Sequence, residues 1–547
     1  MPQALIKNGK TLVSGINPAL RADKLVASFS IKDRTLYFCP SPVYGHGLSL
    51  LLSRLEKEAP GSAVLCIESD NELYDLTRAN IDPSLLINKK LRITNIREGD
   101  KLFNLVRDVW GVRAFRRIEE IRLTGGWQLS PDLYNSLCDH LRREIATDWS
   151  NAMTLAKLGR LYIRNALRNL AVLPQFPSIA NLSYGCKSVL VLGAGPSLDE
   201  TLDSLYRQAL CNTESRSFKI ICVDTCLGAL KDRNIVPDLV VILESQHWNL
   251  RDFTGCRGWN VPAAADLSAL PSSISMLGKE GYLFMTPWTS LRIFNRLKEN
   301  GFLPAVIQPL GSVGLTAVEI AGSLTKGNII CAGLDFSFTA DKYHCKGAPG
   351  HRTKLNTQNR FRGILNTAAY NAHSYAILSK SGFPVFSSPV MRNYLNLFRQ
   401  EFAGDSRLYE IEGSGLSLGV KTLSVSEMIK MLKTDMEDLP RTDAGNKKEC
   451  DFKNIPSDTL RVNSSLMSFL EAELKRLLEL RRLLTGEADA DEKRFSVLVE
   501  ECDYLWAHFP DYSGGRAPDI TDISFLNRIR AELDPMIKLI EQTMKRL

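Results

Sequence analysis

The 547-residue chain has little that would place it in a membrane or in an oxidising compartment. No apolar run is long enough to span a bilayer, and the opening MPQALIKNGK has no apolar core of a signal peptide. Twelve cysteines occur without a Cys-x-x-Cys pair, and Cys66, Cys222 and Cys331 lie in apolar runs. We therefore expect reduced, buried thiols in a cytoplasmic protein, with no disulfide framework and no zinc site.

The sequence also has no excess of charge. A net charge of +7 over this length permits an acidic ligand but gives no reason to expect nucleic acid as a partner. Hydrophobic residues make up 44% and charged residues 24%, as in ordinary globular proteins. The length predicts two to four domains.

Two common nucleotide-binding motifs are missing. A dinucleotide fingerprint after the apolar run SVLVL would need glycine at position 198, where Leu198 stands. The one Gly-Lys-Thr in the chain begins at Gly9, and Ala4 stands where a P-loop has its first glycine. These departures favour neither a standard hydride-carrier site nor a Walker-type ATPase site.

The order of elements predicts an α/β protein with a Rossmann-like central domain. Residues 1–145 alternate strand-like runs (LYFCP, AVLCIES, LRITNI, EIRLT) with helical ones and predict a smaller α/β domain. Residues 146–186 read as a helical connector, 187–435 as the central domain and 455–547 as an all-helical C-terminal domain, preceded by a polar linker at 438–458. The strands expected in the central domain are SVLVL, KIICVD, LVVILE, YLFMT, AVIQP, NIICAGLD, FPVFSS and LYEIEG.

A glycine turn follows the first of these central strands. Gly193 and Gly195 permit a tight turn and a close approach of backbone amides to a ligand, and Pro196 follows. Ser197 and Glu200 match a capping box, so a helix is expected to begin there with its amides and positive dipole end facing an anion. The alternative is a strand–helix turn without a ligand.

Acidic residues end three other strands. Asp224 follows KIICV, Glu244 ends LVVILE and Asp335 follows NIICAGL. Ligands bind at the carboxyl edge of open parallel sheets, so these carboxylates are candidates to bind a ribose, a sugar or a metal ion, or to act as a base. The alternative is that each one caps the following helix.

A second glycine turn and a basic loop lie further along. Ser312 and Gly314 stand between a strand and an amphipathic helix and repeat the arrangement of the first turn. The loop FSFTADKYHCKGAPGHRTK after Asp335 contains His344 and His351 among lysines and arginines. Such a loop could close over an acidic substrate and offer an imidazole, or it could be a solvated surface loop.

The order of these motifs resembles one family. GAGPSL, VDTCLGALKDRNIVPDLVVILE, GSVGLTAVEIA and IICAGLDFSFTADKYHCKG are similar to the Maf (motility-associated factor) glycosyltransferases over most of 187–420. The segment SPVYGHGLSLLLSRL with SAVLCIESD resembles the domain that precedes the core in that family. The core is also similar to the bacterial sialyltransferases.

The resemblance implies transfer of a nonulosonic acid, of the pseudaminic or legionaminic type, from a CMP-activated donor to Ser or Thr of flagellin in the cytoplasm. It places Gly193, Gly195, Pro196 and Ser197 at the nucleotide phosphate, Ser312 and Gly314 in the same pocket and Asp335 at its edge. His344 matches the general base by position and His351 is the second choice. Asp224 and Glu244 remain donor-binding candidates, and a role for Mg²⁺ stays open.

Three alternatives remain. The same core resembles archaeal pterin diphosphokinases of the MptE type, which would use ATP and magnesium. In the N-terminal segment, Gly45-His46-Gly47 with Glu68 imitates a nucleotide-binding β-α-β unit, although we favour a structural or acceptor-docking role there. The third alternative is a non-catalytic scaffold that binds flagellin.

Overall fold

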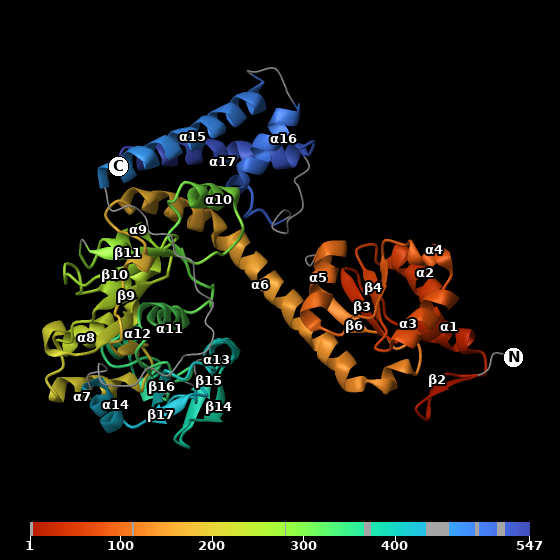
Figure 1. Cartoon of the computed structure of the whole chain (residues 1–547), viewed down its shortest axis with the longest axis horizontal. Coiled ribbons are helices and arrows are strands. Elements are labelled where there is room, and N and C mark those ends of the chain that lie inside the picture. Colours follow the sequence, from red (N-terminus) through yellow and green to blue (C-terminus); the bar gives the residue numbers. More distant parts are fainter. Residues whose placement is uncertain are drawn as a thin grey trace. The chain divides into compact units, whose positions relative to one another are not determined.

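The computed structural model describes residues 4–111, 114–278, 280–365, 373–433, 459–486, 492–510 and 520–547. The chain forms two compact units (Figure 1). The first unit comprises Met1–Lys157 with Ala507–Pro518, and the second comprises Leu158–Trp506 with Asp519–Leu547. In the described part of the chain, no helix is long and apolar enough to cross a membrane.

The first unit is built on a parallel sheet of four strands in the order β5-β4-β3-β6. Alternate residues of β3 point to opposite faces, so Leu36 and Phe38 join one buried cluster and Tyr37 and Cys39 the other. The strands are β3 (Thr35–Pro40), β4 (Ala63–Ile67), β5 (Leu91–Thr94) and β6 (Arg117–Glu120). The helices are α1 (Pro18–Ser28), α2 (Leu48–Glu58), α3 (Asn71–Asn80), α4 (Pro83–Leu86) and α5 (Gly99–Trp110).

The last strand of the sheet and the Gly-Lys-Thr sequence of this unit can be compared with the sequence-based expectation. The last strand pairs with β3 over Arg117–Glu120, so the expected strand EIRLT begins where the observed strand ends. Gly9 lies in the turn between β1 (Leu5–Lys7) and β2 (Lys10–Val13), an antiparallel hairpin with positive φ at Asn8 and Gly9. The Gly-Lys-Thr sequence is therefore part of a hairpin and not a phosphate-binding loop.

The second unit is built on a parallel sheet of nine strands in the order β12-β11-β10-β9-β8-β7-β13-β16-β17. The short run Ala263–Asp266 of β10 was missed because alanine has little β propensity. The expected strand FPVFSS is β15 (Pro384–Ser387), and it pairs with β14 (Tyr375–Leu378) in a separate hairpin. The other strands are β7 (Val189–Leu192), β8 (Lys219–Val223), β9 (Leu239–Ile242), β11 (Gly281–Met285), β12 (Ala305–Val306), β13 (Ile329–Ala332), β16 (Leu408–Ile411) and β17 (Lys421–Leu423).

Helices connect these strands, and the strand order reverses at one place. The chain runs outward from β7 through β8, β9, β10, β11 and β12 and then returns to place β13 on the other side of β7. The carboxyl ends of β7 and β13 therefore form the switch point of a Rossmann-like sheet, where ligands bind in such folds. The helices are α7 (Leu198–Arg207), α8 (Leu227–Asp232), α9 (Pro271–Ile274), α10 (Arg292–Glu299), α11 (Val313–Leu324), α12 (Pro349–Thr357), α13 (Pro389–Phe402) and α14 (Val425–Lys433).

One long helix, α6 (Pro131–Asn169), begins in the first unit and ends in the second. Residues 146–169 of the expected connector are therefore the second half of a single helix. Two buried side-chain amides fix that half to the loops of the large sheet. Asn165 donates to the carbonyls of Ser245 and Ser268. Asn169 donates to the carbonyls of Leu267 and Ala269. The domain boundaries expected from the sequence stay a prediction.

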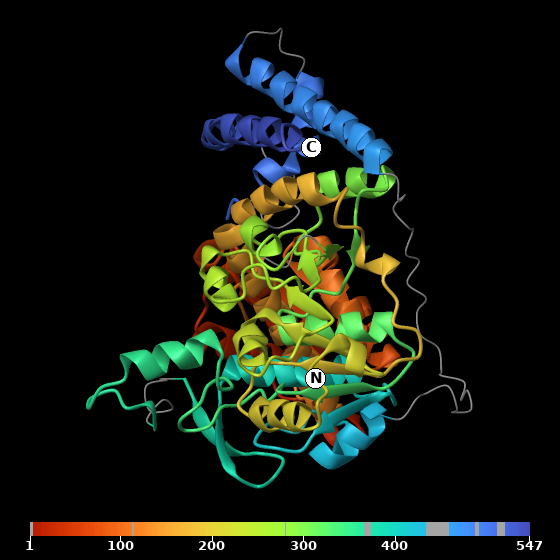
Figure 2. The ribbon, with the colours of Figure 1, turned by 90° about the vertical axis from the view of Figure 1, so that its left-hand side faces the viewer.

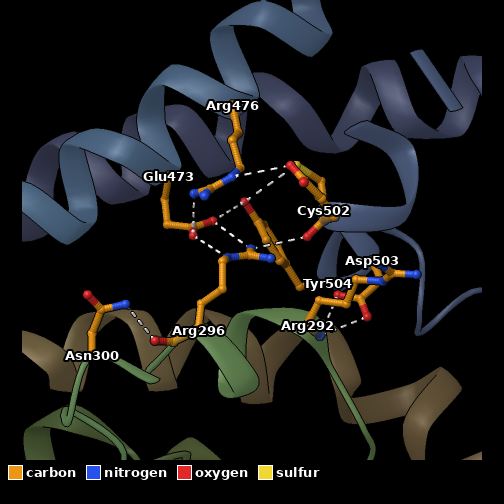
Figure 3. A network of polar contacts seen from close by, with 9 residues as sticks. Arg292, Arg296, Asn300, Glu473, Arg476, Cys502, Asp503 and Tyr504 are labelled. Atoms are coloured by element: carbon orange, nitrogen blue, oxygen red, sulfur yellow. Dashed lines mark hydrogen bonds and ion pairs between the residues drawn. The ribbon is translucent and has the colours of Figure 1, made fainter. Parts of the chain in front are cut away.

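The C-terminal region is helical, as expected, with α15 (Thr459–Thr485) and α17 (Ile523–Met544) packed side by side and α16 (Glu492–Glu501) next to α15 (Figures 1 and 2). A buried ion-pair network joins it to α10 (Figure 3). The Arg296 guanidinium donates twice to the fully buried Glu473 carboxylate, at 2.6 and 2.9 Å, and Arg476 donates to the same carboxylate. The predicted linker 438–458 lies outside the described residues.

Candidate functional site at the switch point

The turns that follow β7 and β13 touch each other. A Cβ on Gly193 would lie 2.5 Å from the Gly333 carbonyl oxygen, and a Cβ on Gly195 would lie 2.5 Å from Oδ2 of Asp335. The amides of both glycines donate across the same contact, to the carbonyls of Ala332 and Gly333 at 2.8 Å. The close approach of two chain segments is therefore sufficient to require both glycines.

Ser197 does not form the capping box that its spacing to Glu200 predicts. Its side chain makes no cap hydrogen bond; its hydroxyl donates to Oδ1 of Asp335 at 2.5 Å and its amide to Oδ2 at 2.8 Å. Burial raises the pKa of Asp335, while the two bonds from Ser197 oppose that shift. The carboxylate of Asp335 thus occupies the start of α7, where the sequence predicts a ligand anion.

The second glycine turn leaves its amides available. Ser312 precedes α11, and a Cβ on Gly314 would lie 2.6 Å from the Leu334 side chain, which also limits the space at Gly193. The two predicted turns therefore lie together at the switch point. Among the described residues, the amides of Val313, Gly314 and Leu315 donate to no protein acceptor. A helix of 12 residues with unpaired N-terminal amides attracts an anion.

Asp224 faces a second carboxylate that the sequence analysis did not identify. The Thr225 hydroxyl lies 3.3 Å from both Oδ1 of Asp224 and Oδ2 of Asp252, which comes from the short helix η8 (His247–Phe253). Burial and the negative charge of Asp252 raise the pKa of Asp224 to about 7. Asn249 of the same helix is buried, and the hydrogen bond of its side chain to Asp224 opposes this rise in pKa.

The other strand-end acids of this edge are engaged locally. Glu244 is exposed and accepts the amide of Gln246 at 2.9 Å, so it caps its own turn. Asp266, at the end of the missed strand β10, is fully buried and accepts bonds from the amide and hydroxyl of both Ser268 and Thr286. Asp266 therefore uses its acceptor sites within the fold, whereas the exposed Glu244 uses one oxygen to cap its own turn.

The loop with the two histidines closes on the first glycine turn. The amide of Cys345 donates to the Ala194 carbonyl at 2.9 Å. Burial, with the charges of Lys354 and Arg251, lowers the pKa of His344 to about 4, so its imidazole is neutral at pH 7. His351 is buried in α12, burial lowers its pKa, and its Nδ1 has no partner in the ranges given above.

Sequence reasoning missed three groups at this edge: Asp252, Asn249 and Arg251. The polar residues were visible in the sequence, because QHWNLRD follows directly after LVVILES. Nothing local shows that η8 folds back over the end of β8. In the described ranges, no group of three or more His, Cys, Asp or Glu side chains could hold a metal ion. The Mg²⁺ hypothesis stays a prediction.

Comparisons with known proteins match the chain to a family model, a curated relative and a solved structure. A family model described as 6-hydroxymethylpterin diphosphokinase MptE-like matches residues 164–341. A protein of Treponema pallidum (strain Nichols), described as uncharacterized, is 29% identical over 534 residues, 95% of this chain and 90% of that one. The solved structure of the MAf glycosyltransferase from Magnetospirillum magneticum AMB-1 aligns with 100% of this chain and 85% of its own, at 13% identity and a TM-score of 0.48. The family model thus bears the name of one group that the sequence motifs resemble, the MptE type.

Proposed function

We propose that this chain is a glycosyltransferase that moves a nonulosonic acid from a CMP-activated donor to Ser or Thr of flagellin. The observation that carries the proposal is the free helix start at Ser312 and Gly314, which lies beside the switch point of the large sheet. The order of the motifs along the chain supports the choice of donor and acceptor.

The donor phosphate binds at the start of α11, where the amides and dipole offset the charge that develops on CMP. The acceptor hydroxyl attacks the anomeric carbon as the bond to the CMP oxygen breaks, and CMP leaves with that electron pair. A neutral imidazole at His344 accepts the hydroxyl proton. Direct attack inverts the anomeric centre and needs no covalent intermediate.

The first experiment measures nucleotide binding by thermal shift with CMP, UMP, ADP and ATP, each with and without magnesium. CMP at a hundred times its dissociation constant stabilises the native state by about 2.7 kcal/mol. Ser312→Trp fills the start of α11 and abolishes the shift, whereas Ser465→Trp on an exposed position of α15 leaves it unchanged. A CMP shift retained by the Ser312 variant places the nucleotide elsewhere.

The second experiment separates the base from donor binding. His344→Gln reduces transfer about 100-fold or more, within the usual range for a general base, and keeps CMP affinity. His247→Gln, on an exposed position of η8, serves as the matched control. Loss of CMP affinity with transfer retained assigns His344 to binding instead.

The alternative of pterin diphosphokinase activity is favoured by the family model that matches residues 164–341. A thermal shift with ATP and magnesium, and none with CMP, selects this alternative. No response to any nucleotide, with retained binding of flagellin, selects the non-catalytic scaffold.

A further inference from the structure

A row of arginines lines a cavity between α6 and α17. Arg160, Arg164 and Arg168 follow one another at intervals of four residues, so they share one face of α6. Asn165 and Asn169, on a neighbouring face of the helix, hold it to the loops after β9 and β10. The helix is therefore fixed, with its arginines on the side of α17.

The cavity measures about 230 Å³, and its far wall comes from α17. Glu532 and Lys538 of α17 lie at its edge, while Met536 and Leu539 give it apolar surface. Figures 1 and 2 show the end of α6 next to α17. This volume exceeds that of a single phosphate group but is below that of a typical drug-sized pocket.

The cavity carries more positive than negative charge. Arg160 pairs with Glu532 at 2.8 Å, which is the single acidic side chain among the lining residues. Arg164, Arg168 and Lys538 form no ion pair with the described residues. Burial and the positive charges of Arg164 and Arg546 lower the pKa of Arg168, so the arginines of this cavity repel one another.

We propose that this cavity binds a phosphate dianion, either free or as the ester of a small molecule. Guanidinium groups donate hydrogen bonds in pairs to the oxygens of a phosphate. A dianion would also balance the positive charges of the lining that the carboxylate of Glu532 leaves uncompensated. The apolar wall from Met536 and Leu539 accommodates the organic part of an ester. The site is separate from the nucleotide site proposed above, because its lining comes from α6 and α17 and includes no residue of the switch point.

The test is isothermal titration of the full-length protein with inorganic phosphate, with glucose 6-phosphate and with sodium chloride at matched ionic strength. Arg164→Gln and Arg168→Gln each weaken phosphate binding at least tenfold. Arg482→Gln, an exposed arginine of α15 that forms no ion pair with the described residues, leaves it unchanged. Ser312→Trp also leaves it unchanged, which distinguishes this cavity from the nucleotide site.

One variant is expected to tighten phosphate binding instead of weakening it. Glu532→Gln frees Arg160 and tightens phosphate binding several-fold, which a merely structural role would not do. Tighter binding of glucose 6-phosphate than of inorganic phosphate supports an ester as the ligand; the reverse supports the free anion. Equal heats from chloride and phosphate, or phosphate binding that survives in Arg164→Gln and Lys538→Gln, overturns the proposal.

Discussion

Glu68 in the first unit and Asp224 in the second each follow a strand of a parallel sheet, and burial raises the pKa of each to about 7. Their surroundings differ. Glu68 accepts bonds from the Ser41 hydroxyl at 2.6 Å, the Thr77 hydroxyl at 2.8 Å and the Val43 amide at 3.1 Å. Asp224 accepts bonds from its neighbour Thr225 and faces a second carboxylate.

The difference shows how to distinguish a structural acid from a candidate functional one. Donors within the first unit occupy both oxygens of Glu68, which supports the structural role favoured for this domain. Asp224 instead stands beside a second carboxylate, Asp252, whose negative charge raises the pKa of Asp224; paired carboxylates of this kind cluster at functional sites. A perturbed pKa alone does not separate the two cases, because both carboxyls have it.

Among these variants, Glu68→Ala is expected to have the largest effect on the free energy of unfolding. The change leaves the donors of Ser41, Thr77 and Val43 buried without an acceptor, at a cost of about 3 to 4 kcal/mol in the free energy of unfolding. Urea unfolding monitored on the first unit measures it. Transfer by the protein that remains folded is expected to be intact, and its loss would reverse the structural assignment.

The pH dependence of stability sharpens the same contrast. Because the pKa of folded Glu68 is about 7 and that of an unfolded glutamate about 4.3, the folded chain holds a proton in this window that the unfolded chain has released. The free energy of unfolding therefore falls as pH rises from about 4.5 to 7, by on the order of 3 kcal/mol. Glu68→Gln is expected to flatten this slope; an unchanged slope assigns it to other groups.

Asp335→Asn tests whether the first glycine turn is held by the chain itself. The amide of asparagine cannot accept from both groups of Ser197, so we expect a loss of about 2 kcal/mol in the free energy of unfolding. A double-mutant cycle with Ser197→Ala measures the coupling. Additive effects of the two changes would show that the contact contributes nothing to stability.

Asp224→Asn is expected to have the smallest effect on stability, with the opposite sign. Removing one charge of the pair relieves the repulsion with Asp252 and stabilises the protein by about 1 kcal/mol at pH 8. Thermal unfolding at pH 8 and at pH 5 measures the gain, which should vanish at the lower pH. Asp252→Asn is the matched partner, and destabilisation by either variant contradicts the assignment.

Much of the fold could be predicted from local patterns. The apolar runs of β7, β8, β9 and β13 are dense in Val, Ile and Leu, as expected for strands buried on both faces. β10 escaped detection because its residues are three alanines and one aspartate. The strand FPVFSS was recognised as a strand, but its separation from the large sheet depends on pairing with β14, which no local pattern specifies.

The candidate site was predicted in part. The sequence located both glycine turns and the strand-end acids, since turn residues and strand ends are local features. It could not show that Asp335 bonds to Ser197, 138 residues away, or that Asp252 lies opposite Asp224. The capping box predicted at Ser197 was therefore wrong, because its hydroxyl and amide bond to the long-range carboxylate of Asp335. The placement of Ser197 at the nucleotide phosphate stays a prediction.

By itself the sequence determined the α/β class, the glycine turns and the acidic strand ends, because each depends on residues close together in the chain. Only the tertiary structure decided which carboxylates are satisfied and which helix start stays free. Hydrogen bonds to buried groups depend on segments that meet only after the sheet has assembled. The same reason left the arginine-lined cavity between α6 and α17 invisible in the sequence, although its arginines are regularly spaced.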